Sequence, residues 1–219
     1  MVFATDDDDG DGDDDDDDEA AAGNNNKKKL SRKEIIDNAL ILIFAGTETS
    51  ASILTNATLF LGFHPKAWNL LVEEQKRIQI QNEQDGDIIT PVSLEATNAP
   101  YLDAVLKETL RIRTVVGGIP RKTLKDINVD GVVVPKGWLI DPSMLLTHEE
   151  DPSTKLPNAM HLDAVQGFRP ERWLGSSSSY ENPNSDWYVP YGFGPRYCLG
   201  KNLAQLEMEI IFGHHGTKD

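Results

Sequence analysis

The sequence has 219 residues, of which 39% are apolar, and a formal net charge of −15. The first 29 residues hold 12 acidic and 3 basic side chains, so residues 30–219 carry a net charge of only −6. A body this mildly acidic has no electrostatic attraction for nucleic acid, and no nucleic-acid partner is expected. A single cysteine excludes an internal disulfide framework, and the length suits one domain with one core.

Residues 1–29 form an acidic segment that we expect to be disordered, because like charges repel and cannot bury apolar surface. Four of its residues match the first half of a calcium-binding loop, namely Asp7, Asp9, Asp11 and Gly12. Asp18 stands where that loop needs Glu, and a run of aspartates produces such matches by chance. A solvated segment is therefore favoured over a calcium site or a binder of basic proteins. The five residues before the acids are too few for a signal peptide.

A long helix is predicted from Ile35 to about Leu61, because Ser31 and Glu34 have the spacing of a capping box and no proline follows until Pro65. The seven apolar residues Ala39–Ala45 predict that this helix is buried on nearly all sides. They are too few to span a membrane as an uninterrupted stretch.

Pro65 opens a second predicted helix with four apolar residues on one side: Trp68, Leu71, Val72 and Ile78. A third helix, ending near Arg113, follows from the helical spacing of Leu102, Val105, Leu106 and Leu110.

The stretch Ile127–Val134 predicts two short strands joined by a turn at Asp130-Gly131. Residues 141–190 are rich in turn-forming residues and are expected to be irregular. Helical periodicity returns beyond Cys198, at Leu199, Leu203, Leu206 and Ile210. The predicted fold class is therefore mainly α with a small β element.

The lone cysteine lies in the glycine-rich segment Tyr191–Gly200. Gly194 and Gly200 permit a tight loop whose backbone can approach a flat ligand. A helix starting after Cys198 would favour its thiolate, and Arg196 supplies a cation for a carboxylate. A lone cysteine is more often a small buried hydrophobic residue, but these neighbours favour the reactive role.

This segment resembles the haem-binding loop of the cytochrome P-450 superfamily, whose pattern is Phe-x-x-Gly-x-Arg-x-Cys-x-Gly. The match has Tyr191 in place of Phe. The resemblance implies haem b as cofactor, with Cys198 as axial ligand of the iron. Tyr191, Gly194, Arg196 and Gly200 would then contact the cofactor.

A second motif, Ala45–Ser50, interrupts the long helix with Gly46, Glu48 and Thr49. A plain explanation is a surface turn of the helix, or a threonine that bonds back to a carbonyl. The motif also matches the family's oxygen-binding pattern. The resemblance implies that Ala45 and Gly46 lie against the haem, while Glu48 and Thr49 deliver protons.

Glu108 and Arg111 are three residues apart, a spacing common in surface ion pairs. The resemblance implies instead a buried structural triad with Arg172. It also implies that Arg121 pairs with a haem propionate. Val115–Arg121, together with Pro135–Trp138, resembles the branch that oxidises retinoids and sterols.

The resemblance implies a carboxy-terminal half of the P-450 fold, truncated at both ends, over residues 30–219. The expected reaction inserts one atom of dioxygen into a lipophilic, retinoid-, sterol- or fatty-acid-like molecule, with electrons from a reductase or ferredoxin. Membrane association at the endoplasmic reticulum is expected, through an anchor outside this chain. The alternative is an inactive partial gene product that retains the haem-binding motifs.

Overall fold

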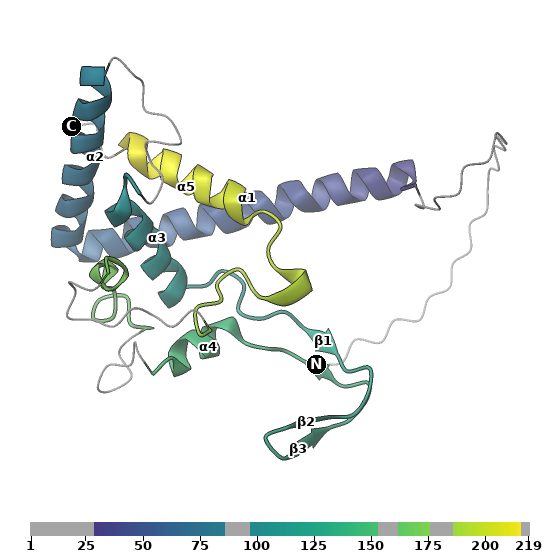
Figure 1. The fold of residues 1–219 in the computed structure, drawn as a ribbon. Coiled ribbons are helices and arrows are strands. Elements are labelled where there is room, and N and C mark those ends of the chain that lie inside the picture. Colours follow the sequence, from purple (N-terminus) through teal and green to yellow (C-terminus); the bar gives the residue numbers. More distant parts are fainter. Residues whose placement is uncertain (1–28, 86–96, 153–161, 176–185, 216–219) are drawn as a thin grey trace. The chain divides into compact units, whose positions relative to one another are not determined.

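The computed structural model describes residues 29–85, 97–152, 162–175 and 186–215. These residues form mainly helices with a few short antiparallel strands, as the ribbon in Figure 1 shows, which confirms the predicted fold class. The chain divides into two compact units, residues 1–38 and 39–219. The acidic segment up to residue 28, with its calcium-loop match, lies outside the described residues.

Helix α1 (Arg32–Phe63) begins with the predicted capping box. The Ser31 hydroxyl accepts the Glu34 amide at 3.2 Å, and the Glu34 carboxylate accepts the Ser31 amide at 2.8 Å. Two amides that the first helical turn leaves unpaired are thereby satisfied, which sets the start of the helix. These bonds also hold the pKa of Glu34 below its ordinary value.

The apolar run Ala39–Ala45 is exposed, so the prediction of a helix buried on nearly all sides was wrong. Leu40 is 60% exposed and Phe44 71%. The buried residues of α1 begin only at Ser50 and continue through Ile53, Ala57 and Phe60. Composition shows that a segment is apolar, but only the tertiary fold decides which turns of a long helix find a partner.

Helix α1 also meets a length-and-composition criterion for crossing a membrane. An 18-residue window within it has a mean hydropathy of 1.2, with 11% of that window buried. The sequence analysis considered only an uninterrupted apolar run, which Asn38 and Gly46 limit to seven residues, so it did not identify this longer and less apolar window. The core helix of a soluble protein meets the same criterion.

Helices α2 (Pro65–Asp85) and α3 (Pro100–Ile112) each begin with proline, which is suited to a first turn because its missing amide has no partner there. The residue before α3, Ala99, provides no side-chain cap. Glu74 of α2 replaces it, and its carboxylate accepts the Tyr101 amide at 2.7 Å and the Leu102 amide at 2.9 Å. Burial raises the pKa of this carboxyl despite these bonds.

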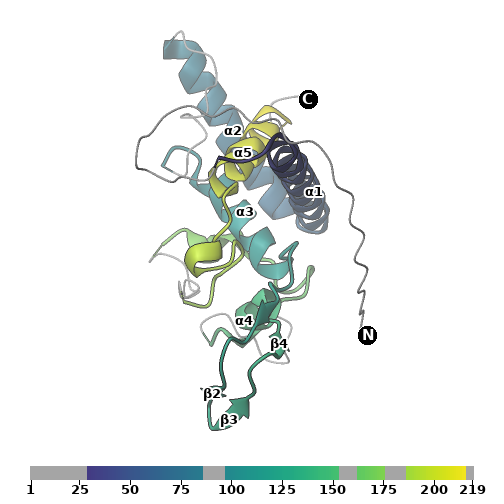
Figure 2. The same cartoon turned by 90° about the vertical axis from the view of Figure 1, so that its right-hand side faces the viewer.

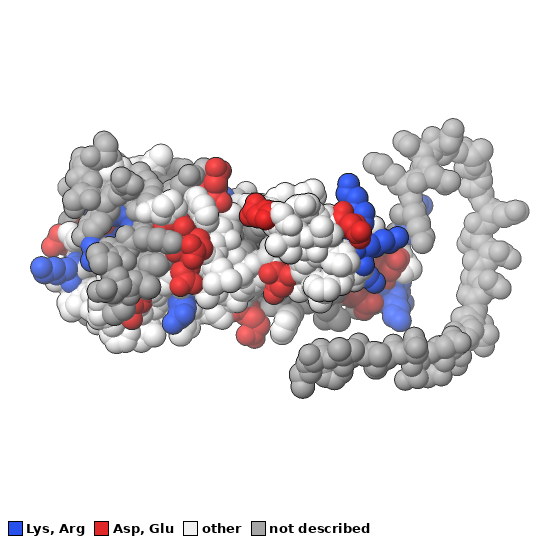
Figure 3. Space-filling model, turned by 90° about the horizontal axis from the view of Figure 1, so that it is seen from below, with Lys and Arg blue, Asp and Glu red and all other residues white. Residues whose placement is uncertain are grey.

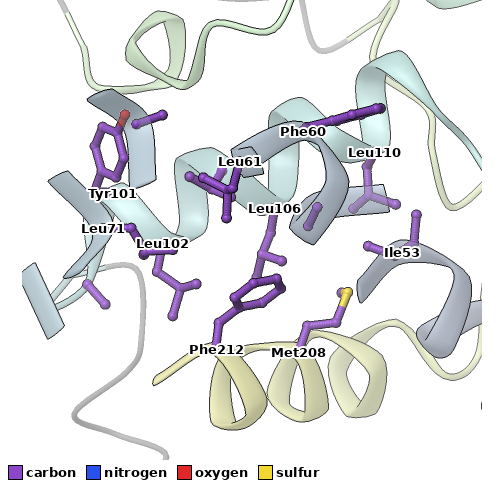
Figure 4. Close-up of a cluster of buried hydrophobic side chains, with 14 of the residues drawn as sticks. Ile53, Phe60, Leu61, Leu71, Tyr101, Leu102, Leu106, Leu110, Met208 and Phe212 are labelled. Atoms are coloured by element: carbon purple, nitrogen blue, oxygen red, sulfur yellow. The ribbon is translucent and has the colours of Figure 1, made fainter. Parts of the chain in front are cut away.

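The core lies where α1, α2, α3 and α5 (Lys201–His215) meet, as the close-up in Figure 4 shows. On α3 all four residues with predicted helical spacing are buried, which confirms that pattern. Leu71 and Ile78 of α2 are buried too, whereas Trp68 is 40% exposed. The labelled core residues are Ile53, Phe60, Leu61, Leu71, Tyr101, Leu102, Leu106, Leu110, Met208 and Phe212.

The β element consists of two separate antiparallel pairs. Strand β1 (Arg121–Lys122) pairs with β4 (Leu139–Ile140), and β2 (Ile127–Val129) pairs with β3 (Val132–Val134). Asp130 and Gly131 both have positive φ, of 51° and 87°, which is the conformation that a two-residue hairpin turn needs. The predicted hairpin is confirmed, and Figure 2 shows it extending away from the helices of its unit.

In the described part of the region 141–190, which the sequence predicted to be irregular, two short helical elements are present. Helix α4 (Met144–Glu150) starts at Ser143, whose hydroxyl accepts the Leu146 amide at 3.1 Å, and the 3-10 helix η3 (Pro170–Trp173) follows later. Neither is long enough to produce a detectable apolar period.

The final helix is present as predicted, but its buried side differs from the leucine pattern. Leu199 is 87% exposed and Leu203 61%, whereas Met208 and Phe212 are buried. The spacing therefore identified the helix correctly without identifying the face that packs.

Charged side chains of both signs are interspersed over the face drawn in Figure 3, and much of that face is uncharged. A mixed distribution gives this face no field of one sign, and so no strong attraction for a polyanion.

Candidate functional site

The only cysteine of the chain lies in an ordered loop between Tyr191 and α5. The Cys198 amide donates to the carbonyl of Tyr191 at 3.0 Å, and the Tyr197 amide donates to that of Gly194 at 3.0 Å. These bonds close the loop around the 3-10 helix η4 (Gly194–Arg196) and leave the Cys198 side chain exposed. Helix α5 starts at Lys201, so the cysteine precedes the helix by three residues.

Two glycines of this loop have positive φ, which side chains disfavour. Gly194, at 67°, was expected to permit a tight loop, whereas Gly192, at 75°, was not singled out from the sequence. A Cβ on Gly192 would also lie 3.2 Å from the side chain of Ile119. Gly200 has an ordinary φ, and a Cβ there would meet no atom within 4 Å.

A cavity of about 680 Å³, part of it open to solvent, lies beside Cys198. Its walls come from α1, α3, α4, α5 and the cysteine loop, and they are mainly apolar. The lining residues are Thr49, Ser50, Ile53, Leu110, Val115, Val116, Ile119, Met144, Pro190, Tyr191, Arg196, Cys198, Ala204 and Met208. A cavity with mainly apolar walls, one thiol and few other polar groups suits an apolar ligand.

A second cavity shares Ile119, Met144 and Arg196 with the first and adds Arg121, Gly192 and Gly194. The Arg121 guanidinium donates to the carbonyl of Pro120 at 3.0 Å. Two arginines therefore lie along this cavity, and guanidinium groups suit carboxylates.

The residues expected on α1 divide into those at the cavity and those away from it. Thr49 lines the cavity, and its hydroxyl donates back to the carbonyl of Ala45 at 2.7 Å. Ala45, Gly46 and Glu48 are exposed and line neither cavity. The back-bonding explanation weighed from the sequence thus describes the Thr49 hydroxyl, although Thr49 also lines the cavity.

Ser50 was not predicted to belong to the site, although it lines the cavity and is only 7% exposed. Its hydroxyl donates to the carboxylate of Glu207 on α5 at 3.0 Å. The bond ties the helix that carries Thr49 to the helix that follows Cys198. The two residues are 157 positions apart, so no local pattern could have paired them.

Glu108, Arg111 and Arg172 form a buried ion cluster. Arg111 donates to both Glu108 oxygens at 2.9 Å, and Arg172 donates to one of them at 3.1 Å. All three side chains are at most 2% exposed. The Glu108–Arg111 spacing would equally suit a surface pair, and burial is what gives this pair its energetic weight.

Glu108 accepts further bonds from around η3, from the Trp173 indole at 2.9 Å and from the Arg169 amide at 3.0 Å. Burial is the strongest single influence on this carboxyl and opposes its ionisation. The two arginines and these bonds together outweigh burial and hold the pKa of Glu108 below its ordinary value.

Tyr191, which was expected to stand in for a phenylalanine, contacts Tyr197 of the cysteine loop with its ring. Its ring centroid is 6.4 Å from that of Tyr197, and the Lys201 ammonium lies 5.8 Å from the Tyr191 ring. Burial, reinforced by the charge of Cys198, raises the pKa of Tyr191 to about 12. Its hydroxyl therefore stays protonated at neutral pH.

Comparison with known proteins identifies the family. The cytochrome P450 family profile matches residues 16–215.

This chain belongs to the cytochrome P450 family.

Its relatives include a putative cytochrome P450 120 from Synechocystis sp., 35% identical over 83% of this chain and 37% of that protein. A steroid (22S)-hydroxylase from Oryza sativa subsp. indica is 37% identical over 85% of the chain and 35% of that protein. The structure of retinoic acid-bound cyanobacterial CYP120A1 superposes with a TM-score of 0.69 and 36% identity. This superposition covers 89% of the present chain and 41% of the CYP120A1 chain. The P450 chain thus spans little more than a third of the curated relatives it matches.

Cytochromes P450 use haem b as cofactor, and the residues around the two cavities fit that group. A flat macrocycle needs apolar walls, its iron needs a soft ligand and its two carboxylates need cations. The cavities provide apolar side chains for the macrocycle and the Cys198 sulfur for the iron. Arg121 and Arg196 provide cations for the carboxylates.

Proposed function

We propose that this P450 chain carries the haem-binding part of a monooxygenase acting on lipophilic molecules. The single observation behind this proposal is that Cys198 and Thr49 line one apolar cavity from separate elements, the loop before α5 and the middle of α1. A thiolate to hold the iron and a hydroxyl able to move a proton are two groups that such a reaction would use.

In this proposal Cys198 is the iron ligand, and Arg121 and Arg196 hold the two carboxylates. Bound haem would supply the activation of dioxygen that inserts one oxygen atom into a C–H bond and releases the other as water, using electrons from a reductase or ferredoxin. The buried ion cluster of Glu108, Arg111 and Arg172 keeps the cysteine loop in place and takes no part in the chemistry.

Thr49 handles the proton on the cavity side. Its Oγ1 donates to the Ala45 carbonyl and keeps lone pairs that can accept a proton. To donate into the cavity the hydroxyl rotates away from that carbonyl. Glu48, one residue earlier and exposed, exchanges protons with solvent in this scheme. Buried apolar residues such as Ile53 and Leu110 limit the water that reaches their side of the cavity.

The names of the relatives support a retinoid or sterol as the substrate class, since they include a steroid hydroxylase and a retinoic acid-bound protein. The mainly apolar cavity suits either class. Membrane association is a further part of the proposal. It does not rest on α1, because α1 contributes Thr49, Ser50 and Ile53 to the cavity.

The test is a haem titration of the chain followed by the spectrum of its reduced, carbon-monoxide-bound form. A strongly red-shifted Soret band is expected, since only a thiolate ligand produces it. A band typical of nitrogen-ligated or free haem would contradict the proposal for this chain and favour a polypeptide that retains the motifs without the function.

Replacing Thr49 by Ala is expected to uncouple electron use from product formation. Without the hydroxyl, the proton is not delivered at the cavity, so more of the electrons end in hydrogen peroxide. The ratio of peroxide to product should rise about tenfold or more, because one general acid–base group usually changes a rate by more than that. The measurement is the ratio of peroxide to product with a reductase present.

Thr55→Ala is the matched control for this variant. Thr55 lies on the same helix, and its hydroxyl bonds back to the Ala51 carbonyl at 2.8 Å, but it does not line the cavity. Its coupling should equal that of the unmodified chain. Equal coupling in Thr49→Ala as well would remove the proton-transfer role.

A further inference from the structure

We propose that His148 of α4 is a positioning residue, whose imidazole ties the segment entering the cysteine loop to the end of α3. The proposal deepens the proposed function, since it assigns a support to the same haem site. His148 touches neither cavity and was not among the residues expected from the sequence.

The His148 ring is only 1% exposed, and both of its nitrogens are used. Nε2 lies 3.0 Å from the Val189 amide, and Nδ1 lies 3.0 Å from the Arg111 carbonyl. The amide can only donate and the carbonyl can only accept. Nε2 is therefore unprotonated and Nδ1 carries the single proton, which makes this ring neutral.

Val189 connects this bond to Cys198. Its carbonyl accepts the Gly192 amide at 2.9 Å, which forms the turn that contains Pro190 and Tyr191. The carbonyl of Tyr191 then accepts the Cys198 amide at 3.0 Å. The amide and the carbonyl of Val189 are thus both hydrogen-bonded. These two bonds, the chain from Val189 to Gly192 and the bond of Tyr191 to Cys198 together connect the ring to the cysteine loop.

At its other end the path reaches the buried ion cluster, because the carbonyl that His148 contacts belongs to Arg111. The side chain of that residue pairs with Glu108. The cluster is fully buried and held by several charge-assisted hydrogen bonds, so a segment bonded to it through a buried ring has a fixed position. His148 transmits that position to a loop 41 residues away from it in sequence.

The neighbouring residue reinforces the contact. The Tyr188 ring stacks on His148 with centroids 5.5 Å apart and an interplanar angle of 23°, and it meets the Trp173 ring at 4.6 Å. The Tyr188 hydroxyl donates to the Lys107 carbonyl of α3 at 3.2 Å. Two successive residues of the segment, 188 and 189, are thereby attached to α3, one directly and one through the imidazole.

The bond to Val189 survives only while Nε2 is unprotonated. Burial lowers the pKa of His148 to about 4 and the nearby Arg111 charge acts in the same sense, whereas the bond to the Arg111 carbonyl and the charge of Asp151 act in the opposite sense. Tyr188 faces the ring from the loop segment and is neutral. Above this pKa the ring accepts the Val189 amide; below it the two groups are both donors and separate.

Three substitutions separate the two bonds of the ring. His148→Gln places an amide oxygen near the position of Nε2 and can keep the bond to Val189. His148→Asn places its amide near Nδ1 and can keep only the bond to Arg111. His148→Leu fills the space and keeps neither.

The first readout is amide hydrogen exchange of the segment 186–200, expressed as protection relative to the unstructured rate. His148→Asn and His148→Leu are expected to lose about five- to tenfold in protection there, the size of one buried hydrogen bond, whereas His148→Gln stays close to the unmodified chain. Unchanged exchange in His148→Asn would overturn the proposal. An equal loss in the α3 peptide 100–112 would overturn it too, since the residue would then stabilise the whole fold.

A pH series gives a second readout that packing alone would not change. Protection of residues 186–200 should fall more in the unmodified chain than in His148→Gln as pH decreases through about 4, because both proteins share the effect of Glu108 and only the unmodified chain has the imidazole. Parallel pH profiles in the two proteins would contradict the assignment.

The haem spectrum distinguishes failure of this proposal from failure of the proposed function. If the unmodified chain binds haem through its thiolate, His148→Asn should shift part of the reduced, carbon-monoxide-bound form away from the red-shifted band, and His148→Gln should not. If the unmodified chain lacks that band, the proposed function fails while the exchange measurement still decides the role of His148.

Discussion

Replacing Glu108 by Gln is expected to lower the free energy of unfolding by about 3–5 kcal/mol, because it removes a buried carboxylate charge that pairs with two buried arginines. The carboxylate accepts bonds from Arg111, Arg172, Trp173 and the Arg169 amide, and an amide cannot accept them all. Urea unfolding followed by circular dichroism measures the change. A loss below about 1 kcal/mol would mean that the cluster is worth no more than a surface pair.

The matched control lies on the same helix. Asp103 pairs with Lys107 at 2.6 Å, but the lysine side chain is 41% exposed. Asp103→Asn should therefore cost less than about 1 kcal/mol, since exposed pairs contribute little in water. The difference between the two variants isolates the effect of burial.

The pH dependence of stability gives an independent check on Glu108. Its folded-state pKa is held below the ordinary value of 4.5, so the unfolded chain binds the proton more readily. The stabilisation is complete above the unfolded pKa and is lost as pH falls through the folded pKa. The acid-induced loss should be smaller in Glu108→Gln, which has no carboxyl to protonate.

Replacing Cys198 by Ser is expected to abolish the red-shifted Soret band of the reduced, carbon-monoxide-bound form. Cys198 is the only cysteine of the chain, so no other residue can supply a thiolate. A serine hydroxyl stays protonated at neutral pH and is a poor ligand for iron, and haem affinity should fall by at least about tenfold, the usual effect of disturbing a metal site. The band and the titration midpoint are the two measurements.

Tyr191→Phe is the control for this substitution. It keeps the ring beside the loop, removes one hydroxyl and restores the residue typical of the family pattern. The red-shifted band should persist in this variant. Persistence of the same band in Cys198→Ser would remove Cys198 as the iron ligand, whatever the control shows.

Residues that interact with near neighbours were predictable from the sequence. The Ser31–Glu34 capping box, the Asp130-Gly131 hairpin and the proline starts of α2 and α3 all depend on atoms within a few residues of one another. The buried pattern of α3 was predictable as well, because this helix is surrounded and its apolar spacing is regular. The family and its fold followed from short motifs in order along the chain.

Contacts between distant segments were not predictable, and they decide much of the site. Glu74 caps α3 from another helix, Ser50 bonds Glu207 on α5, and His148 contacts both Arg111 and Val189. Each of these side chains is polar and unremarkable in its local sequence. Their roles arise only where the fold buries them against one particular partner.

The sequence by itself determined the fold class and the family, because these depend on local geometry and on short motifs. Only the tertiary structure decided that Ala39–Ala45 is exposed, that Thr49 lines the cavity while Glu48 does not, and that Met208 and Phe212 form the packed side of α5. The physical reason is that burial depends on which surfaces meet. The spacing of apolar residues indicates which side of a helix can be buried. The arrangement of the other elements decides which side is buried.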